Sequence, residues 1–271
     1  MSLSPDTTTT TATPSTEAPA AAPPLLSIDG AIATITLRRP ATHNRIEPDD
    51  VGVLRGYLQQ LNADASVRVI VFASSGKSFS SGFDLTRLGG AASAHENTFE
   101  MLTDEIENAR AITIARLHAP VYGGSTDLVL ACDFRLGVRG MRMFMPAARL
   151  GLHYYPHGIR RWVSRLGLGA AKRLFLTSRP IQDEEMLRIG YLDALVEPAQ
   201  LDAELMQWTD DLLAQGPVPL VSMKKTLNEV ARGQYDETTA SAAYGASLGT
   251  RDIQEALAAF AENRKPVFAG H

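Results

Sequence analysis

The fold of this chain is indicated most clearly by two stretches, Gly76-Lys77-Ser78-Phe79-Ser80-Ser81-Gly82-Phe83-Asp84-Leu85 and Tyr122-Gly123-Gly124-Ser125-Thr126-Asp127. In each, glycine stands where an apolar strand gives way to a helix. Glycine permits a turn that aims bare backbone N–H groups at a developing negative charge. Taken singly, each glycine is explained by a tight turn or by close helix packing. Together the two stretches predict a pair of backbone donors, as in an oxyanion hole.

The apolar pattern around these stretches predicts alternating strands and helices. Residues 25–28 and 31–37 read as two strands joined by an Asp29-Gly30 hairpin turn. Helices are expected over residues 47–62, 98–111 and 125–132, and further strands over 67–72, 112–117, 134–138 and 141–144. A strand, a helix and a strand in succession imply a right-handed crossover. We therefore predict an α/β core.

The pattern after Gly158 is almost wholly helical. Helices are expected over residues 159–166, 170–176, 183–189, 201–214, 220–231, 238–248 and 252–263. We divide the chain into a leader (1–24), an α/β core (25–200) and a C-terminal helical module (201–271). The leader consists largely of Thr, Ala, Pro and Ser, so we expect it to be disordered, because this composition buries too little apolar surface to order itself.

Composition limits the classes of function. The chain has 271 residues, is 45% hydrophobic and carries a net charge of −4. It has no run of about 18 apolar residues and no stripe of Lys and Arg, which argues against membrane insertion and nucleic-acid binding. The single Cys132 excludes an internal disulfide and favours a reducing, cytoplasmic setting. His153 and His157 have metal-site spacing, but Pro156 interrupts the helix that such a site needs, so we expect no metal.

Several motifs in the same order resemble the enoyl-CoA hydratase/isomerase family, the crotonase superfamily. They are Phe79 to Leu85, Gly123-Gly124 with Asp127-Leu128 and Cys132-Asp133, Leu150-Gly151 with Arg161, Leu176-Thr177 with Ile189-Gly190, and Asp252 to Ala256 with Asn263 to Pro266. The resemblance runs from about Leu25 to the C-terminus. It implies a spiral of ββα units, a trimer or a dimer of trimers, and acyl-CoA thioester substrates with no further cofactor.

The resemblance also assigns candidate binding residues. In the family, two backbone N–H groups hold the thioester carbonyl, and these map to Phe83 and Gly124. The residues expected to contact coenzyme A are Ala41, Arg45, Ser81, Phe83, Arg87 and Gly124. For the two arginines, the alternative is a solvated surface cation.

The acid and base depart from the family pattern. Typical hydratases place one glutamate three residues after the second oxyanion glycine and another just after the proline that precedes Leu-Gly. This chain has Asp127 at the first position and Ala147 at the second. Asp127 is a candidate general base or acid, or else a carboxylate favoured in the first turn of a helix. His153 and then Tyr154 are candidate proton donors, or else side chains that shape the acyl pocket.

These residues predict an enzyme that forms an enolate from an acyl-CoA thioester. The first interpretation is enoyl-CoA hydration, dehydration or double-bond isomerisation, with Asp127 moving the proton. The loss of the second carboxylate argues against ordinary water addition by two glutamates. An acyl-CoA decarboxylase or carbon–carbon hydrolase is the second interpretation, and a catalytically degenerate acyl-CoA-binding protein is the third.

Overall fold

The computed structural model describes residues 21–84 and 98–270. Its centre is a six-stranded sheet with strand order β1-β2-β3-β4-β6-β9, and a three-stranded sheet, β5-β7-β8, lies beside it. The strands are β1 (Ala22–Asp29), β2 (Ile32–Arg38), β3 (Val69–Ser74), β4 (Ile112–Leu117), β5 (Val121–Tyr122), β6 (Phe134–Val138), β7 (Arg142–Phe144), β8 (Ile181–Gln182) and β9 (Ala194–Val196).

The large sheet opens with the hairpin that the sequence predicts. β1 pairs antiparallel with β2, and Gly30 makes the turn with a left-handed φ of 55°. β1 begins at Ala22, so residues 22–24 belong to the sheet and not to the leader. Two side chains hold this end, since Arg38 donates to the carbonyl of Pro23 and Tyr57 donates to that of Pro24. Residues 1–20 of the expected leader lie outside the described residues.

The remaining strands of the large sheet run parallel to one another. β3 and β4 are buried at all but one position each, as is typical of strands covered on both faces. The helices are α1 (Pro48–Ala63), α2 (Thr98–Glu107), α3 (Ser125–Ala131), α4 (Pro156–Thr177), α5 (Asp183–Arg188), α6 (Leu201–Leu213), α7 (Pro217–Arg232), α8 (Glu237–Leu248) and α9 (Arg251–Ala261), with 3-10 turns η1 (Pro40–Thr42), η3 (Ala148–Leu150) and η4 (Pro198–Gln200). The predicted α/β core is confirmed, with its parallel sheet and C-terminal helices.

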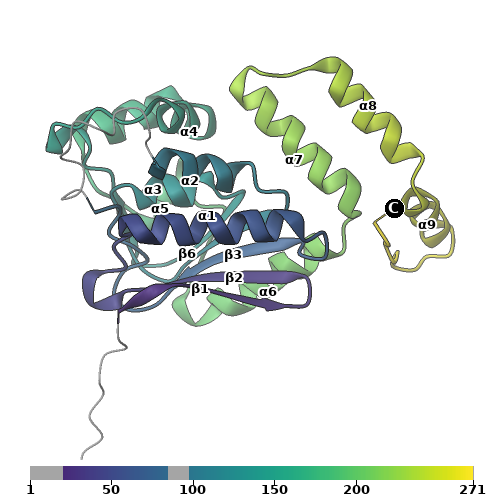
Figure 1. The fold of residues 1–271 in the computed structure, drawn as a ribbon, viewed down its shortest axis with the longest axis horizontal. Coiled ribbons are helices and arrows are strands. Elements are labelled where there is room, and N and C mark those ends of the chain that lie inside the picture. Colours follow the sequence, from purple (N-terminus) through teal and green to yellow (C-terminus); the bar gives the residue numbers. More distant parts are fainter. Residues whose placement is uncertain (1–20, 85–97, 271) are drawn as a thin grey trace, which may run out of the picture.

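The boundary of the helical module differs from the prediction. α6 packs against β3, β4 and β6, and the Trp208 ring lies 4.8 Å from that of Phe134. It is therefore part of the core, so the boundary at residue 201 is too early. The two short strands β8 and β9 also interrupt the region predicted to be almost wholly helical. The module consists of α7, α8 and α9, and Figure 1 shows α8 and α9 extending away from the sheet.

Candidate active site

The two glycine-containing stretches lie against each other at the end of the sheet. Gly82 and Gly123 have left-handed φ values of 99° and 57°, which glycine adopts without strain. A Cβ at Gly82 would stand 2.9 Å from the backbone nitrogen of Gly124. The Ser80 and Ser125 hydroxyls, both buried, share a 2.6 Å hydrogen bond that joins the two stretches. Only glycine at position 82 allows this close approach.

Two backbone N–H groups at this contact are left without an acceptor. Three N–H groups nearby donate: Gly82 to the Ser80 hydroxyl, Asp84 to the carbonyl of Ile46, and Gly123 to the carbonyl of Phe144. Within the described residues, no hydrogen bond is found for the N–H of Phe83 or of Gly124. Both residues are half-buried and line a pocket, so an acceptor from outside the chain can reach these two donors.

A pocket of about 340 Å³ opens at this pair of donors. Its lining is almost entirely apolar and comes from both glycine turns, from β7 and from the loop around η3. The lining residues are Ser81, Phe83, Tyr122, Gly123, Gly124, Phe144, Met145, Pro146, Ala147, Leu150, Leu152 and Tyr154. Ala147, where typical hydratases carry a glutamate, is one of the walls. A site with few polar groups strengthens the hydrogen bonds that remain in it.

Asp127 lies behind this pocket and is fully buried. Its Oδ2 atom accepts a hydrogen bond of 2.5 Å from Arg161 and one of 2.6 Å from the Tyr155 hydroxyl. The Tyr154 hydroxyl in turn donates to that of Tyr155 at 3.0 Å. Tyr154 is one of the residues that line the pocket, so the two phenols connect a pocket-lining residue to Asp127. Burial raises the pKa of Asp127, an effect that Arg161 only partly offsets.

Arg161 holds Asp127 within a buried cluster of charges. Its side chain is fully buried and also pairs with Asp104 at 2.7 Å and with Glu107 at 3.2 Å. Burial opposes the charge of this guanidinium, but the carboxylates of Asp127 and Glu107 outweigh it and raise the pKa of Arg161. Arg232 of α7 joins Glu107 at 2.9 Å. The cluster therefore connects α2, α3 and α4 with the C-terminal module.

We expect Arg161→Met to lower the free energy of unfolding by about 3–5 kcal/mol, because it leaves the fully buried carboxylate of Asp127 without its cation. Urea denaturation followed by circular dichroism measures this change. Arg188→Met is the matched control, since Arg188 pairs with Glu185 at the surface and such pairs contribute about 0–1 kcal/mol. Equal losses in the two variants would show that the buried cluster is not a stabilising feature.

Comparison with known proteins identifies the family of this chain. The enoyl-CoA hydratase/isomerase family model matches residues 27–271. The chain belongs to the enoyl-CoA hydratase/isomerase family. It is 26% identical to the short-chain-enoyl-CoA hydratase of Clostridium acetobutylicum, over 89% of this chain and 95% of the relative. It is also 26% identical to the crotonyl-CoA hydratase of Syntrophomonas wolfei, over 90% of this chain and 96% of the relative.

A solved structure shows the same fold. The enoyl-CoA hydratase from Bacillus anthracis superposes with a TM-score of 0.84 at 25% identity, over 92% of this chain and 99% of that one. The resemblance to the family that the motifs indicated is therefore confirmed.

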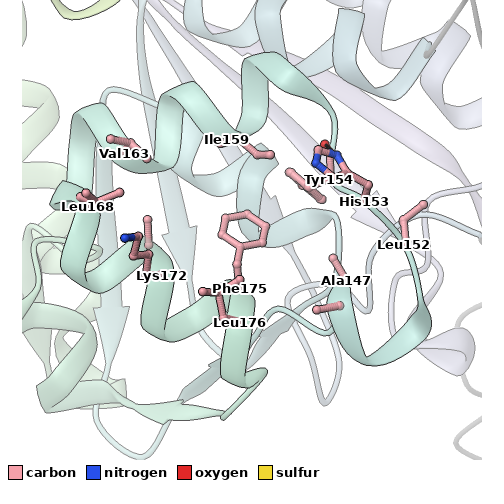
Figure 2. A pocket seen from close by; sticks show the side chains of 12 residues that line it. Ala147, Leu152, His153, Tyr154, Ile159, Val163, Leu168, Lys172, Phe175 and Leu176 are labelled. Atoms are coloured by element: carbon pink, nitrogen blue, oxygen red, sulfur yellow. Dashed lines mark hydrogen bonds between the residues drawn. The ribbon is translucent and has the colours of Figure 1, made fainter.

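The structure brings together some of the predicted catalytic residues of this family member. Phe83, Gly124 and Tyr154 line one pocket. Asp127 contacts that pocket only through the two tyrosines. His153 is exposed, and its Nδ1 atom lies 2.8 Å from the carbonyl of Tyr154. It lines a neighbouring groove at the start of α4, as Figure 2 shows, and not the pocket at the two donors.

Three of the predicted coenzyme A contacts, Ala41, Arg45 and Ser81, belong to the first glycine turn and the segment beside it. Ser81 lines the pocket, and its hydroxyl donates to Thr42 beside Ala41. Arg45 is paired with Glu47 at 2.8 Å and lies 3.8 Å from Asp84. Arg87 lies outside the described residues. Within the described ranges, no group of three or more His, Cys, Asp or Glu side chains is arranged to hold a metal ion, and no helix is long and apolar enough to cross a membrane.

Sequence reasoning missed the two residues that hold Asp127. Tyr155, which stands directly before Pro156 at the start of α4, is not among the candidate residues named from the sequence. Arg161 entered only as a family marker. A signal for it exists, since Arg161 and Arg165 are four residues apart on one helix face, while Asp104 and Glu107 are three apart on another.

Proposed function

We propose that this enzyme moves the double bond of an enoyl-CoA thioester through an enolate. The observation that carries the proposal is the hydrogen-bonded chain from Tyr154 through Tyr155 to Asp127, which ends at the pocket where the Phe83 and Gly124 donors are free. Those two N–H groups would form the oxyanion hole for the thioester oxygen. Because Ala147 stands in place of a second carboxylate, the chain from Tyr154 to Asp127 both removes the proton and returns it.

The hydrogen-bond directions suit removal of a proton from the substrate. Tyr154 donates to Tyr155, and Tyr155 donates to Asp127. When the Tyr154 oxygen takes a proton from Cα of a 3-enoyl thioester, its own proton passes to Tyr155 and that of Tyr155 passes to Asp127. The C–H electron pair enters the conjugated enolate, whose oxygen is held by Phe83 and Gly124. Return of the proton along the same chain to Cγ completes a 2-enoyl thioester.

The two phenols act as carriers and not as the final base. Burial raises the pKa of both phenols well above 10, so a free phenolate is disfavoured in this site. Asp127, with its raised pKa, is the group that retains the proton. Concerted transfer along the two hydrogen bonds, of 3.0 Å and 2.6 Å, avoids a phenolate intermediate.

The experiment is conversion of 3-enoyl-CoA to 2-enoyl-CoA, followed by mass spectrometry and by the absorbance of the conjugated product. We expect Tyr154→Phe to reduce kcat/KM by about 10²- to 10⁴-fold, because it removes the atom that contacts the substrate. Tyr57→Phe, which deletes a hydroxyl bonded to Pro24 away from the pocket, is the control. A wild-type rate in Tyr154→Phe would remove this residue from the mechanism.

The same assay separates the alternative reactions. A product heavier by one water indicates hydration, the activity in the names of the two relatives above. Loss of carbon dioxide from a malonyl-type thioester, or release of a free acid from a β-keto thioester, indicates decarboxylation or carbon–carbon hydrolysis. Calorimetric binding of acyl-CoA without any product indicates a degenerate binding protein.

The pH dependence of kcat/KM tests whether Asp127 is the base. Because burial raises the pKa of Asp127 above its ordinary 3.8, Asp127 becomes protonated at a higher pH than a solvated aspartate. We expect kcat/KM to fall as pH decreases, with a midpoint above 3.8. A profile that stays flat until the protein unfolds, as judged by circular dichroism at each pH, would contradict an ionised Asp127 as base.

We further propose a homotrimer or dimer of trimers in the cytoplasm that needs no cofactor beyond the coenzyme A of its substrate. Exposed apolar side chains on the C-terminal module support assembly; they include Leu227, Tyr244, Leu257 and Phe260, the last 88% exposed. A monomeric mass in light scattering would contradict it.

A further inference from the structure

The buried arginine beside Asp127 is shared among three carboxylates. Nη1 of the Arg161 guanidinium lies 2.5 Å from Asp127, and Nη2 lies 2.7 Å from Asp104. Its Nε atom lies 3.2 Å from Glu107. The side chains of Arg161 and Asp127 are fully buried, and that of Glu107 is nearly so. Because charges interact strongly where water is excluded, a change at one of these carboxylates affects the hold of Arg161 on the others.

Glu107 links this arginine to the C-terminal module. Its nearest basic group among the described residues is Arg232 of α7, at 2.9 Å. The arginines of α4 lie further away: Arg161 at 3.2 Å, Arg165 at 3.4 Å and Arg160 at 3.8 Å. Burial opposes the charge of Glu107, but the arginines around it outweigh burial and lower the pKa of this carboxyl. Glu107 is therefore ionised at neutral pH, and it interacts with α4 and α7 at once.

The ionisation of Asp127 depends on how Glu107 divides its interaction. The charged and titratable groups around Asp127 are Arg161 and Arg165 of α4, Tyr154 and Tyr155 just before that helix, Glu107 of α2, and Tyr191. Burial raises the pKa of Asp127, the charge of Arg161 lowers it, and the charge of Glu107 raises it. A cation that occupies Glu107 leaves Arg161 free to hold Asp127 in its ionised form, which is the form that accepts a proton.

We propose that Arg232 is a positioning residue for the base: it holds Glu107, so that Arg161 remains on Asp127 and keeps it ionised. The C-terminal module thereby takes part in the acid/base site, although no residue of α7 lines the pocket at Phe83 and Gly124. The inference rests on the proposed function, which makes Asp127 the base.

Two substitutions should move the titration of Asp127 in opposite directions. Glu107→Gln removes the charge that competes for Arg161, so the midpoint should fall by about one pH unit. Arg232→Met leaves Glu107 to the arginines of α4, so Glu107 draws Arg161 away from Asp127. The midpoint should then rise by about half a pH unit, because Arg232 acts through Arg161 and not directly. A loss of packing does not predict opposite shifts.

NMR of the full chain, labelled with ¹³C at the aspartate carboxyl groups, measures this midpoint without turnover. The resonance of Asp127 is the one that disappears in Asp127→Asn. The low-pH limb of kcat/KM should shift with the NMR midpoint. Affinity for saturated acyl-CoA should stay unchanged in both variants, because neither Glu107 nor Arg232 lines the pocket.

Three further variants separate charge from packing. Arg232→Lys keeps the cation and should restore the wild-type midpoint. The double variant Glu107→Gln with Arg232→Met should titrate like Glu107→Gln alone, since Arg232 acts only through Glu107; this variant also removes both charges of the pair together, which favours folding. Lys224→Met is the matched control. It removes another buried cation of α7, which pairs with Asp133 at 2.6 Å, and it should leave the midpoint unchanged.

His157 needs a control of its own. It lies 2.5 Å from Asp104, the third carboxylate around Arg161, and a histidine can change its charge between pH 5 and 8. The titrations are therefore repeated with His157→Gln in every variant. The opposite shifts of Glu107→Gln and Arg232→Met should persist in that background.

The proposal is overturned if Glu107→Gln and Arg232→Met leave the midpoint at its wild-type value or shift it in the same direction. It is also overturned if Lys224→Met shifts the midpoint as much as Arg232→Met. If the shifts appear but no 3-enoyl-CoA is isomerised, the positioning role stands and the proposed reaction fails. If Asp127→Asn abolishes isomerisation but the shifts are absent, the reaction stands and the role of Arg232 is wrong.

Discussion

Asp127→Asn is expected to reduce kcat/KM for 3-enoyl-CoA by about 10²- to 10⁴-fold, the range typical for loss of a positioned base. The amide can still accept the hydrogen bond from Tyr155, but it cannot take up a proton. Because Asp127 is fully buried and has no direct contact with the pocket, the loss should appear mainly in kcat and leave the affinity for saturated acyl-CoA nearly unchanged. Stopped assays of 2-enoyl-CoA formation measure it.

The variant also removes a charge that faces Arg161, so its fold must be checked separately. Asp193→Asn is a matched control, since Asp193 is a partly buried carboxylate paired with Arg135 at 2.7 Å and lies outside the candidate site. It should lose stability to a comparable degree and keep its activity. If Asp127→Asn retains the wild-type rate on the best substrate, the chain from Tyr154 to Asp127 does not carry the proton.

Much of the fold follows from local sequence patterns. The Asp29-Gly30 turn, β4 and the helices of the C-terminal third lie within a few residues of the expected ranges. These elements have a strong apolar period or a specific turn residue, and both are local properties. The two- and three-residue strands β5, β8 and β9 have neither, because their pairing depends on partners distant in the chain.

Long-range packing also explains the misplaced domain boundary. α6 is amphipathic like the helices that follow it, and its own pattern does not tell which surface its apolar face will meet. That face meets the sheet, through residues such as Trp208. A helix packed on the sheet and a helix in an appended module have the same periodicity.

The part of the candidate site that depends on backbone conformation was predictable from the sequence. The glycines of the two turns are visible in the sequence and predicted a pair of backbone donors, and the resemblance to the family mapped that pair to Phe83 and Gly124. The roles of the side chains could not be predicted in the same way, because adjacent residues differ in their surroundings. His153 is exposed, whereas Tyr154 is buried and hydrogen-bonded to Tyr155. Which of them faces the pocket is decided by how the start of α4 docks on α2 and α3.

Gly82→Ala is expected to lower kcat by about 10²- to 10³-fold, the effect of losing one oxyanion donor. The new Cβ would stand 2.9 Å from the backbone nitrogen of Gly124 and 3.0 Å from the carbonyl oxygen of Tyr122. Both are backbone atoms and cannot rotate away, so the two turns must separate. Separation moves the Phe83 and Gly124 donors apart, and a single thioester oxygen can no longer be held by both.

The effect of the collision can be separated from that of the left-handed conformation. Gly30→Ala introduces the same methyl group at a φ of 55° in the β1–β2 hairpin, where no atom lies within 4 Å of the new Cβ. It should lower the free energy of unfolding by about 1–2 kcal/mol and leave kcat unchanged. Gly82→Ala should lose both stability and kcat. If Gly82→Ala is as active as Gly30→Ala, close approach of the two turns is not what prepares the donors, and the oxyanion assignment fails.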